Sequence, residues 1–169
     1  MGILSGNPKA EPMHYGEVFA TWTYLLTEKS MVASYQTLIN HTGDDDLKKL
    51  LHEAIKDTKE ETEKVEELLK ANGVSIPPAP PERPLANLDD IPSGARFADQ
   101  EIAAMLSMNS AAGLATCSAI MGESIREDIG LMFGKFHASK AMFGAKVLKL
   151  NKEKGWLVPP PLHLNTPNK

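Results

Sequence analysis

The alternation of apolar and polar residues predicts two helices before a proline-rich break. In residues 13–41, apolar side chains recur at intervals of three, four and seven, which places them on one helical face. These side chains are Val18, Trp22, Leu25, Val32 and Ile39. Residues 44–72 carry a near-heptad opposite a face rich in Lys and Glu, and its members are Leu47, Leu51, Ile55, Thr58, Thr62, Val65 and Leu69. The acidic run at Asp44 suits a helix start, and Asn72 followed by Gly73 suits a helix end.

Two more helices are predicted after the break, over residues 98–122 and 124–154. The first is rich in Ala, Ser and Gly, which let helices approach closely, so we expect it to be the most enclosed of the four. Ser124 and Glu127 have the spacing of a capping box and predict the start of the last helix. The alternative is one unbroken helix over 99–154, roughly 84 Å long at 1.5 Å per residue. A chain of this size favours two helices.

The break itself, residues 73–97, contains six of the twelve prolines and predicts an extended connector. Proline lacks a backbone N–H and disfavours helix in the residue before it. About 20 extended residues at about 3.1 Å each reach roughly 60 Å, which exceeds the length of each predicted helix. Two interpretations remain, a strap lying along the bundle and a flexible linker between independent hairpins. Apolar residues that can anchor a strap favour the first, namely Ile76, Leu85, Leu88, Ile91 and Phe97.

These elements predict one all-α domain over residues 1–169, a ferritin-like four-helix bundle with one long crossover. A strap of this length makes the first and fourth helices run one way and the second and third the other. Residues 155–169 form an extended tail that begins at Gly155 and Trp156. The pattern leaves open whether this tail packs on its own bundle or on a neighbouring molecule.

Composition narrows the function. The formal charge is −4 and no basic stripe is present, which argues against a nucleic-acid partner. No apolar run approaches about 18 residues, so no membrane association is expected. The N-terminus lacks a signal-peptide pattern, and the single Cys117 fits a reducing compartment, so we expect synthesis in the cytoplasm. Phosphate-binding loops, zinc-binding cysteine pairs and the Gly-x-Ser-x-Gly elbow are absent, and the sequence favours no enzymatic activity.

A polar layer at the middle of the predicted bundle is a candidate metal site. Carboxylate-bridged di-metal bundles use Glu-x-x-His on two of their helices, and this spacing does not occur here at a suitable level. Glu28, Glu61 and the flanking His137 are the remaining candidates for a remodelled iron or manganese site. The favoured alternative is a structural one, in which Glu28, Lys29, Glu61 and Lys140 form ion pairs at the edges of the bundle and Asn109 fixes the helix register.

A second candidate cluster lies at one end of the bundle. In the crossover topology, the start of the first helix meets the start of the fourth. His14 and Glu17 are then expected to approach Glu123 and Glu127. We favour a surface ion pair or a helix cap for these residues over a metal site.

Five sequence segments resemble an uncharacterised bacterial family. They are LINHTGDDDLKKLL, SIPPAPPERP, SGARFADQEI, SIREDIGLMFGKF and KGWLVPPP. Proteins of this family are ferritin-like four-helix bundles described as spore-coat-like proteins of spore-forming bacilli, and the resemblance covers nearly the whole chain.

The resemblance implies a structural or assembly role in the spore coat, through self-association or contact with other spore-coat proteins. In the family, a histidine takes the position of Glu61, which weakens the inference of a metal site here. The alternative function is a ferritin-like metal-binding or oxidase protein with a degenerate site that holds iron or manganese.

Overall fold

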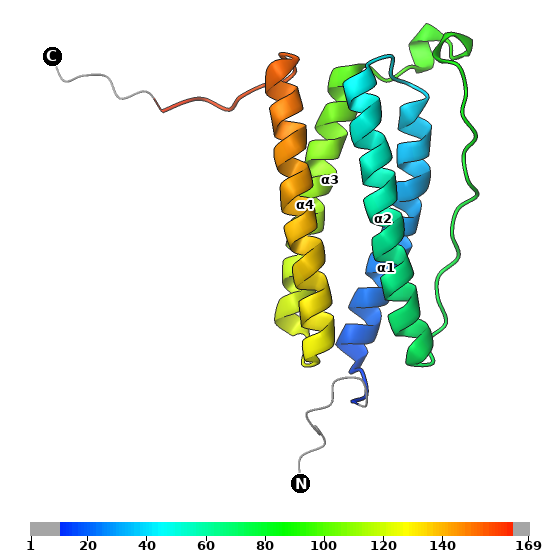
Figure 1. Cartoon of the computed structure of the whole chain (residues 1–169), viewed down its shortest axis with the longest axis vertical. Helices are drawn as coiled ribbons and strands as arrows, with labels where there is room; N and C mark the ends of the chain where they lie inside the picture. Colours follow the sequence, from blue (N-terminus) through cyan, green and yellow to red (C-terminus); the bar gives the residue numbers. More distant parts are fainter. Residues whose placement is uncertain (1–10, 164–169) are drawn as a thin grey trace, which may run out of the picture.

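The computed structural model describes residues 11–163 and is all-helical over that range. Its four long helices are α1 (Tyr15–Ile39), α2 (Asp45–Ala71), α3 (Asp99–Glu123) and α4 (Glu127–Glu153), shown in Figure 1. Two short 3-10 turns, η2 (Leu88–Asp90) and η3 (Ser93–Ala95), precede α3. The four-helix bundle is therefore confirmed. The chain leaves helical geometry between α3 and α4, so these are two helices and not one.

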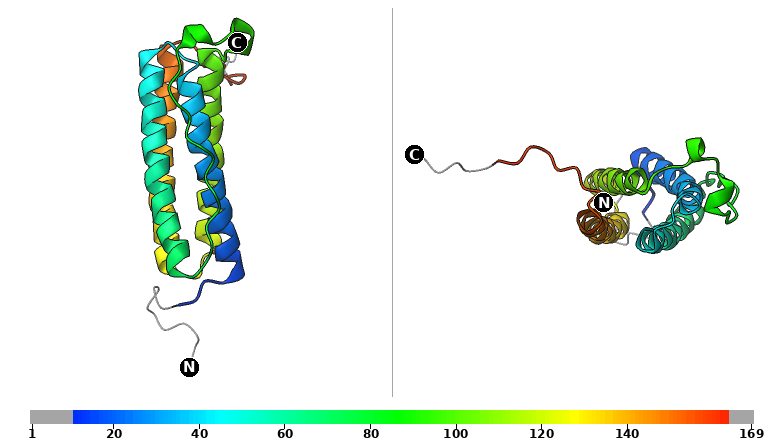
Figure 2. Two further views of the ribbon diagram at one scale, coloured as in Figure 1. Left: turned by 90° about the vertical axis from the view of Figure 1, so that its right-hand side faces the viewer. Right: turned by 90° about the horizontal axis from the view of Figure 1, so that it is seen from above.

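The helices form two antiparallel hairpins, α1 with α2 and α3 with α4, which lie side by side (Figures 1 and 2). The connector returns along the length of the bundle before α3 begins. As a result α1 and α4 run in one direction and α2 and α3 in the other (Figure 1). This is the arrangement that the long crossover predicted.

The hydrophobic core consists of two separate clusters of buried side chains. One includes Leu51 of α2 and Leu106 of α3, and the other includes Leu25 of α1 and Phe133 of α4. Removing these side chains from water is the main force that holds the hairpins together. Between the two clusters the buried residues are polar, and they form the candidate site described below.

The start of the C-terminal tail packs on its own bundle. Gly155 has a φ of +71°, which ends α4, and the amide of Trp156 donates to the carbonyl of Asn151 at 2.8 Å. The indole of Trp156 then packs against the core cluster that contains Leu51 and Leu106. Beyond it the chain leaves the bundle, and Val158 is 89% exposed.

The proline-rich connector is a strap that lies along α1 and α2 (Figure 2, left). Four polar side chains of α1 hold it at intervals of seven, seven and four residues, which is one helical face. Trp22 and Lys29 donate to the carbonyls of Ser75 and Pro77, at 2.9 and 2.8 Å. Further along, Gln36 accepts from the amide of Arg83, and Asn40 bonds both the carbonyl of Pro84 and the amide of Ala86, each at 3.0 Å.

The expected apolar anchors contribute less to the strap than these hydrogen bonds. Leu85 is 79% exposed and Phe97 is 40% exposed, although Ile76 does pack against the core. The physical reason is that an extended segment has no internal partners for its carbonyl groups. Side chains of α1 supply those partners, and the strap therefore needs few apolar contacts.

Helix α3 is not the most enclosed helix, contrary to the expectation from its small residues. The stretch Ser93–Glu123 is long and apolar enough by length and composition to cross a membrane, and it alone passes that test within the described residues. Only 28% of its most apolar window is buried, however. Small side chains let α3 lie close to α4 on one side and leave its opposite side uncovered.

Replacing Asn40 with Ala should release the strap near Pro84 and Ala86. The variant loses two hydrogen bonds, so we expect the free energy of unfolding in urea to fall by about 1–2 kcal/mol. Limited proteolysis within residues 73–97 should also become faster. Ser34→Ala is the matched control, because Ser34 bonds only the carbonyl of Ser30 on its own helix. Equal behaviour of the two variants would show that these bonds do not hold the strap.

Candidate functional site

The polar layer at the middle of the bundle is centred on one ammonium group. Lys140 of α4 reaches between Glu28 of α1 and Glu61 of α2, with its Nζ 3.2 Å from Glu28 Oε1 and 2.9 Å from Glu61 Oε2. The hydroxyl of Tyr24 donates to Glu61 Oε2 at 2.6 Å. Both glutamates are buried, at 7% and 5% exposure. Three helices thus contribute to one buried charge cluster, the Lys140 cluster (Tyr24, Glu28, Glu61 and Lys140).

A glycine on α3 makes room for this lysine. A Cβ atom at Gly113 would lie 2.7 Å from Lys140 Cδ and 3.2 Å from its Cε. Contacts this short force the side chain to move. Gly113 therefore lets the aliphatic part of Lys140 pass directly over α3 before its ammonium group reaches the two carboxylates.

The charges of the cluster are coupled. Burial raises the pKa of Glu28 above its usual value, although the ammonium of Lys140 opposes this shift. Burial disfavours the charged form of Lys140, but the charges of Glu28 and Glu61 outweigh it and raise the lysine pKa. Burial also raises the pKa of Tyr24. The lysine is therefore a protonated cation and the tyrosine a neutral donor, so neither is a ready nucleophile at neutral pH.

The neighbouring Cys117 is equally unreactive. It is fully buried in the core, and burial raises its pKa to about 11. Almost none of this cysteine is therefore deprotonated at neutral pH, and the thiolate is the reactive form.

A pocket of about 550 Å³ opens between α1 and α3 and ends at the Lys140 cluster. Residues of all four helices line it, with Phe19 and Ala112 among the exposed ones and Glu28 and Glu61 among the buried ones. Its volume lies within the range of about 300–1,000 Å³ that is typical of small-molecule sites.

Of the three mid-bundle metal candidates, the structure brings two together. Glu28 and Glu61 both meet Lys140, while His137 is partly buried one turn earlier on α4 and makes no hydrogen bond or ion pair to another described residue. Within residues 11–163, no group of three or more His, Cys, Asp or Glu side chains is placed to hold a metal ion. Two carboxylates already paired with an ammonium do not fit a di-metal centre, which needs more donors and no resident cation.

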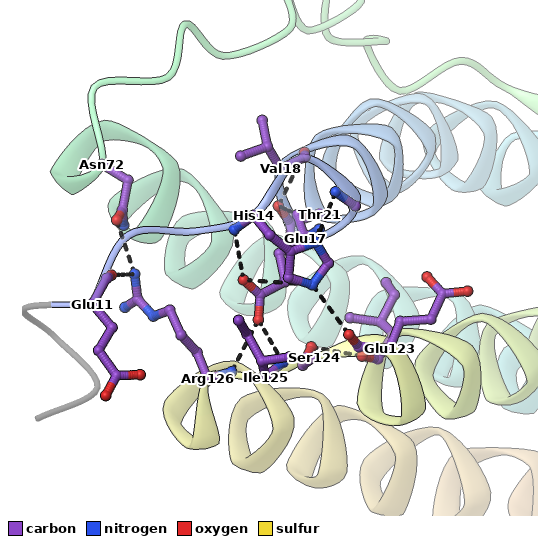
Figure 3. A network of polar contacts seen from close by, with 12 residues as sticks. Glu11, His14, Glu17, Val18, Thr21, Asn72, Glu123, Ser124, Ile125 and Arg126 are labelled. Carbon is purple, nitrogen blue, oxygen red and sulfur yellow. Dashed lines mark hydrogen bonds and ion pairs between the residues drawn. The ribbon is translucent and has the colours of Figure 1, made fainter. Parts of the chain in front are cut away.

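The end cluster joins two helix starts through one buried carboxylate (Figure 3). Glu17 is 1% exposed and accepts from the amide of His14 at 3.1 Å, which completes a capping box on α1. Its other oxygen accepts from the amides of Ile125 and Arg126, at 2.9 and 3.0 Å, just before α4. One carboxylate therefore satisfies free N–H groups at the starts of both helices, where negative charge is favourable.

His14 completes this cap through both of its ring nitrogens. Its Nδ1 accepts from the amides of Gly16 and Glu17, so its Nε2 carries the proton and donates to the carbonyl of Glu123 at 3.2 Å. The sequence correctly brought His14 and Glu17 to the start of α4, but Glu127 was wrong as their partner. Glu127 is exposed and makes no hydrogen bond to either residue.

The capping box expected at Ser124 is also absent. The hydroxyl of Ser124 donates to the carbonyl of Ile120 at 2.6 Å, at the end of α3, and α4 begins three residues later, at Glu127. Sequence reasoning missed Glu17 as the cap of α4 because the two are more than a hundred residues apart. A local pattern cannot show a cap that is donated from another helix.

Arg126 ties this end of the bundle together (Figure 3). Its guanidinium is 2% exposed on the side chain and makes a two-pronged contact with Asp128, at 3.0 and 2.7 Å. It also donates to Asn72 Oδ1 at 2.9 Å and to the carbonyl of Glu11 at 3.1 Å. These bonds join the end of α2, the segment before α1 and the start of α4, which is a structural role.

Comparison with known proteins places the chain in a family. A family model described as "Protein of unknown function (DUF3231)" matches residues 1–168. The chain belongs to this family. The uncharacterized protein YvdQ of Bacillus subtilis (strain 168) is 62% identical over 164 residues, which cover 97% of this chain and 96% of YvdQ.

Two solved structures share the fold. A Bacillus halodurans C-125 protein described as a "putative spore coat protein" is 61% identical, with a TM-score of 0.93, over 94% of this chain and 100% of that one. A conserved hypothetical protein of Mycobacterium tuberculosis has a TM-score of 0.63 at 14% identity, over 89% of this chain and 96% of that one. The second likeness shows the fold alone. This DUF3231 chain therefore shares its fold with a 61%-identical protein over nearly its whole length.

Replacing Lys140 with Met should leave two buried carboxylates without their cation. We expect a loss of about 3–5 kcal/mol in the free energy of unfolding, the usual cost of breaking a buried ion pair from one side. Adding Glu28→Gln and Glu61→Gln to the same chain should recover part of this loss, because the unpaired charges are then gone. Urea unfolding measures both effects. If the Lys140→Met variant is as stable as the parent, the cluster does not contribute to stability.

Glu28→Gln alone should change how stability depends on pH. A buried carboxyl with a raised pKa favours folding below its unfolded pKa, and this contribution is lost as the pH rises through the folded pKa. The glutamine variant lacks this titration. Its stability relative to the parent should therefore increase as the pH rises above about 4.3, the usual glutamate value. Parallel urea titrations from pH 4 to 8 test this, and a constant or falling difference would contradict it.

Proposed function

We propose that this chain is a structural or assembly protein of the spore coat that self-associates through the exposed face of α3. Support for the location comes from the Bacillus halodurans relative, which is described as a "putative spore coat protein" and matches at 61% identity over nearly the whole chain. The chain would be made in the cytoplasm and then incorporated into the coat, next to copies of itself or other coat proteins.

The exposed face of α3 is the observation that carries the self-association. Between Glu101 and Glu123 the helix contains no charged residue. Six exposed residues follow one another at alternating intervals of four and three, the spacing of a helix–helix seam. This α3 seam consists of Ala104, Met108, Ala111, Ala115, Ser118 and Gly122.

The α3 seam has the shape and chemistry of an interface. It extends over about 27 Å at 1.5 Å per residue. Its side chains are small, so a second helix can approach its backbone closely, and Met108, which is 70% exposed, supplies a flexible apolar side chain. A contiguous uncharged patch on a helix that is otherwise part of a stable bundle is typical of a protein–protein contact. The matching surface that we propose is the same seam on a second copy.

The chemistry of the interior is consistent with a structural role. The lysine and tyrosine of the Lys140 cluster are held in their unreactive protonation states, and Cys117 is buried as a thiol. A ferritin-like metal-binding or oxidase activity with iron or manganese has less support, because the ammonium of Lys140 already lies between the two carboxylates that would bind the metal.

The substitution Ala115→Lys places a charge in the middle of the α3 seam and tests the proposal. Size-exclusion chromatography with light scattering should show a dimer or larger assembly for the parent chain and a monomer for this variant, with an unchanged circular dichroism spectrum. The matched control is His52→Lys, which adds the same charge at an exposed position on α2 and should keep the assembly.

The same variants, epitope-tagged and produced in a sporulating Bacillus host, test the location. The parent chain and His52→Lys should appear in the extracted coat fraction, and Ala115→Lys should be reduced there. A parent chain that is monomeric at all concentrations would contradict the self-association. A parent chain found only outside the spore would contradict the coat location.

A further inference from the structure

The pocket between α1 and α3 has no part in the assembly role. We propose that it binds an organic cation, a small molecule with one ammonium group carried on an apolar body. The charges at its floor, the rings in its walls and its volume all fit such a molecule.

Negative charge dominates the pocket. Four carboxyl groups and one ammonium group line it, and these are Glu28, Asp57, Glu61, Glu123 and Lys140. Lys140 divides its contacts between Glu28 and Glu61, so a single positive charge is shared by two buried carboxylates. A second cation at this site would balance the negative charge that Lys140 does not neutralise.

Burial makes two of these carboxyls costly to ionise without a cation beside them. Burial is the main cause that raises the pKa of Glu28, and the charge of Glu61 adds to it. Burial likewise raises the pKa of Asp57, with further contributions from Glu53 and Glu60. Asp57 accepts no hydrogen bond from another described residue, so its carboxylate is free to receive one from a ligand.

Aromatic rings supply the second element of recognition. Phe19, Tyr24, Tyr35 and Phe143 all line the pocket. The face of an aromatic ring attracts a cation within about 6 Å of its centre, and Lys140 Nζ already lies 5.6 Å from the centre of the Tyr24 ring. Together with carboxylates, such rings are the groups that recognise an ammonium ligand with an apolar body.

Other ligand classes fit the pocket less well. An anion would face four carboxyl groups, and the one ammonium in the pocket is already bonded to two of them. A neutral apolar molecule would contact the apolar walls, but it would cover the carboxylates without giving them a hydrogen bond or an opposite charge. Removing them from water in this way is unfavourable. The volume of about 550 Å³ is sufficient for a chain of several carbon atoms with its charged head.

Three eight-carbon probes that differ only in their heads test the proposal. These probes are octylammonium, 1-octanol and octanoate, each used below its micelle concentration at pH 7. Binding to the full chain is measured by isothermal titration calorimetry and by the shift in melting temperature. We expect octylammonium to bind with a dissociation constant at least about tenfold lower than that of octanol, because it makes one charge-assisted hydrogen bond more. Octanoate should show no binding.

Variants locate the site. Glu28→Gln and Asp57→Asn should each weaken octylammonium binding about tenfold by removing a charge-assisted bond. Glu67→Gln is the matched control, because it removes the same charge from an exposed position of α2 outside the pocket and should leave binding unchanged. Ala112→Phe fills the open side of the pocket while all its charges remain, and should abolish binding without loss of stability. Asp57 and Ala112 are not fully buried, so their variants remain informative if Glu28→Gln folds poorly.

Several results would overturn the proposal. The first is that no probe binds at millimolar concentration, and the second is that octanoate or octanol binds as tightly as octylammonium. The third is that Glu67→Gln weakens binding as much as Asp57→Asn, because the attraction would then come from the net charge of the protein and not from the pocket. The assembly of the chain through the α3 seam is measured separately, so either proposal can fail alone.

Discussion

The contact of one buried ammonium with two buried carboxylates is the constraint that the middle of this bundle depends on. Lys140 comes from the α3–α4 hairpin, and Glu28 and Glu61 come from the α1–α2 hairpin. The hydrophobic clusters lie on either side of this layer and do not cover it. Buried charges are costly unless they are paired. The position of one hairpin relative to the other is therefore fixed at mid-height by electrostatics and toward both ends by apolar packing.

The two ends of the bundle are closed by polar groups that come from distant parts of the chain. Glu17 of α1 caps the start of α4, and Arg126 joins the start of α4 to the end of α2. The strap is held in the same manner, since Lys29 and Asn40 of α1 bind its free carbonyl groups. At Glu17 and along the strap, backbone groups without partners in their own element receive them from a helix that lies alongside.

The small residues of α3 have two consequences. On the inner side, Gly113 lets Lys140 cross the helix and reach the carboxylates. On the outer side, the absence of long charged side chains leaves the α3 seam exposed and uncharged. One compositional feature thus builds the interior site and creates the surface that we propose for assembly. The pocket ends at the charge cluster, and Glu28, Glu61 and Lys140 are among its lining residues.

The sequence by itself determined the four helices, their pairing and the crossover, because these depend on local periodicity and on prolines that exclude helix. It also placed Glu28 and Glu61 at one level and brought Glu17 to the start of α4. Only the tertiary structure decided how these residues contact one another. Lys140, expected at an edge, lies in the centre because Gly113 of another helix leaves it room. His137 stays apart, and Glu17 replaces the expected cap at Ser124. The tertiary structure also decided which face of α3 is exposed. Small residues permit close packing, but the arrangement of the hairpins determines which side of the helix receives a neighbour.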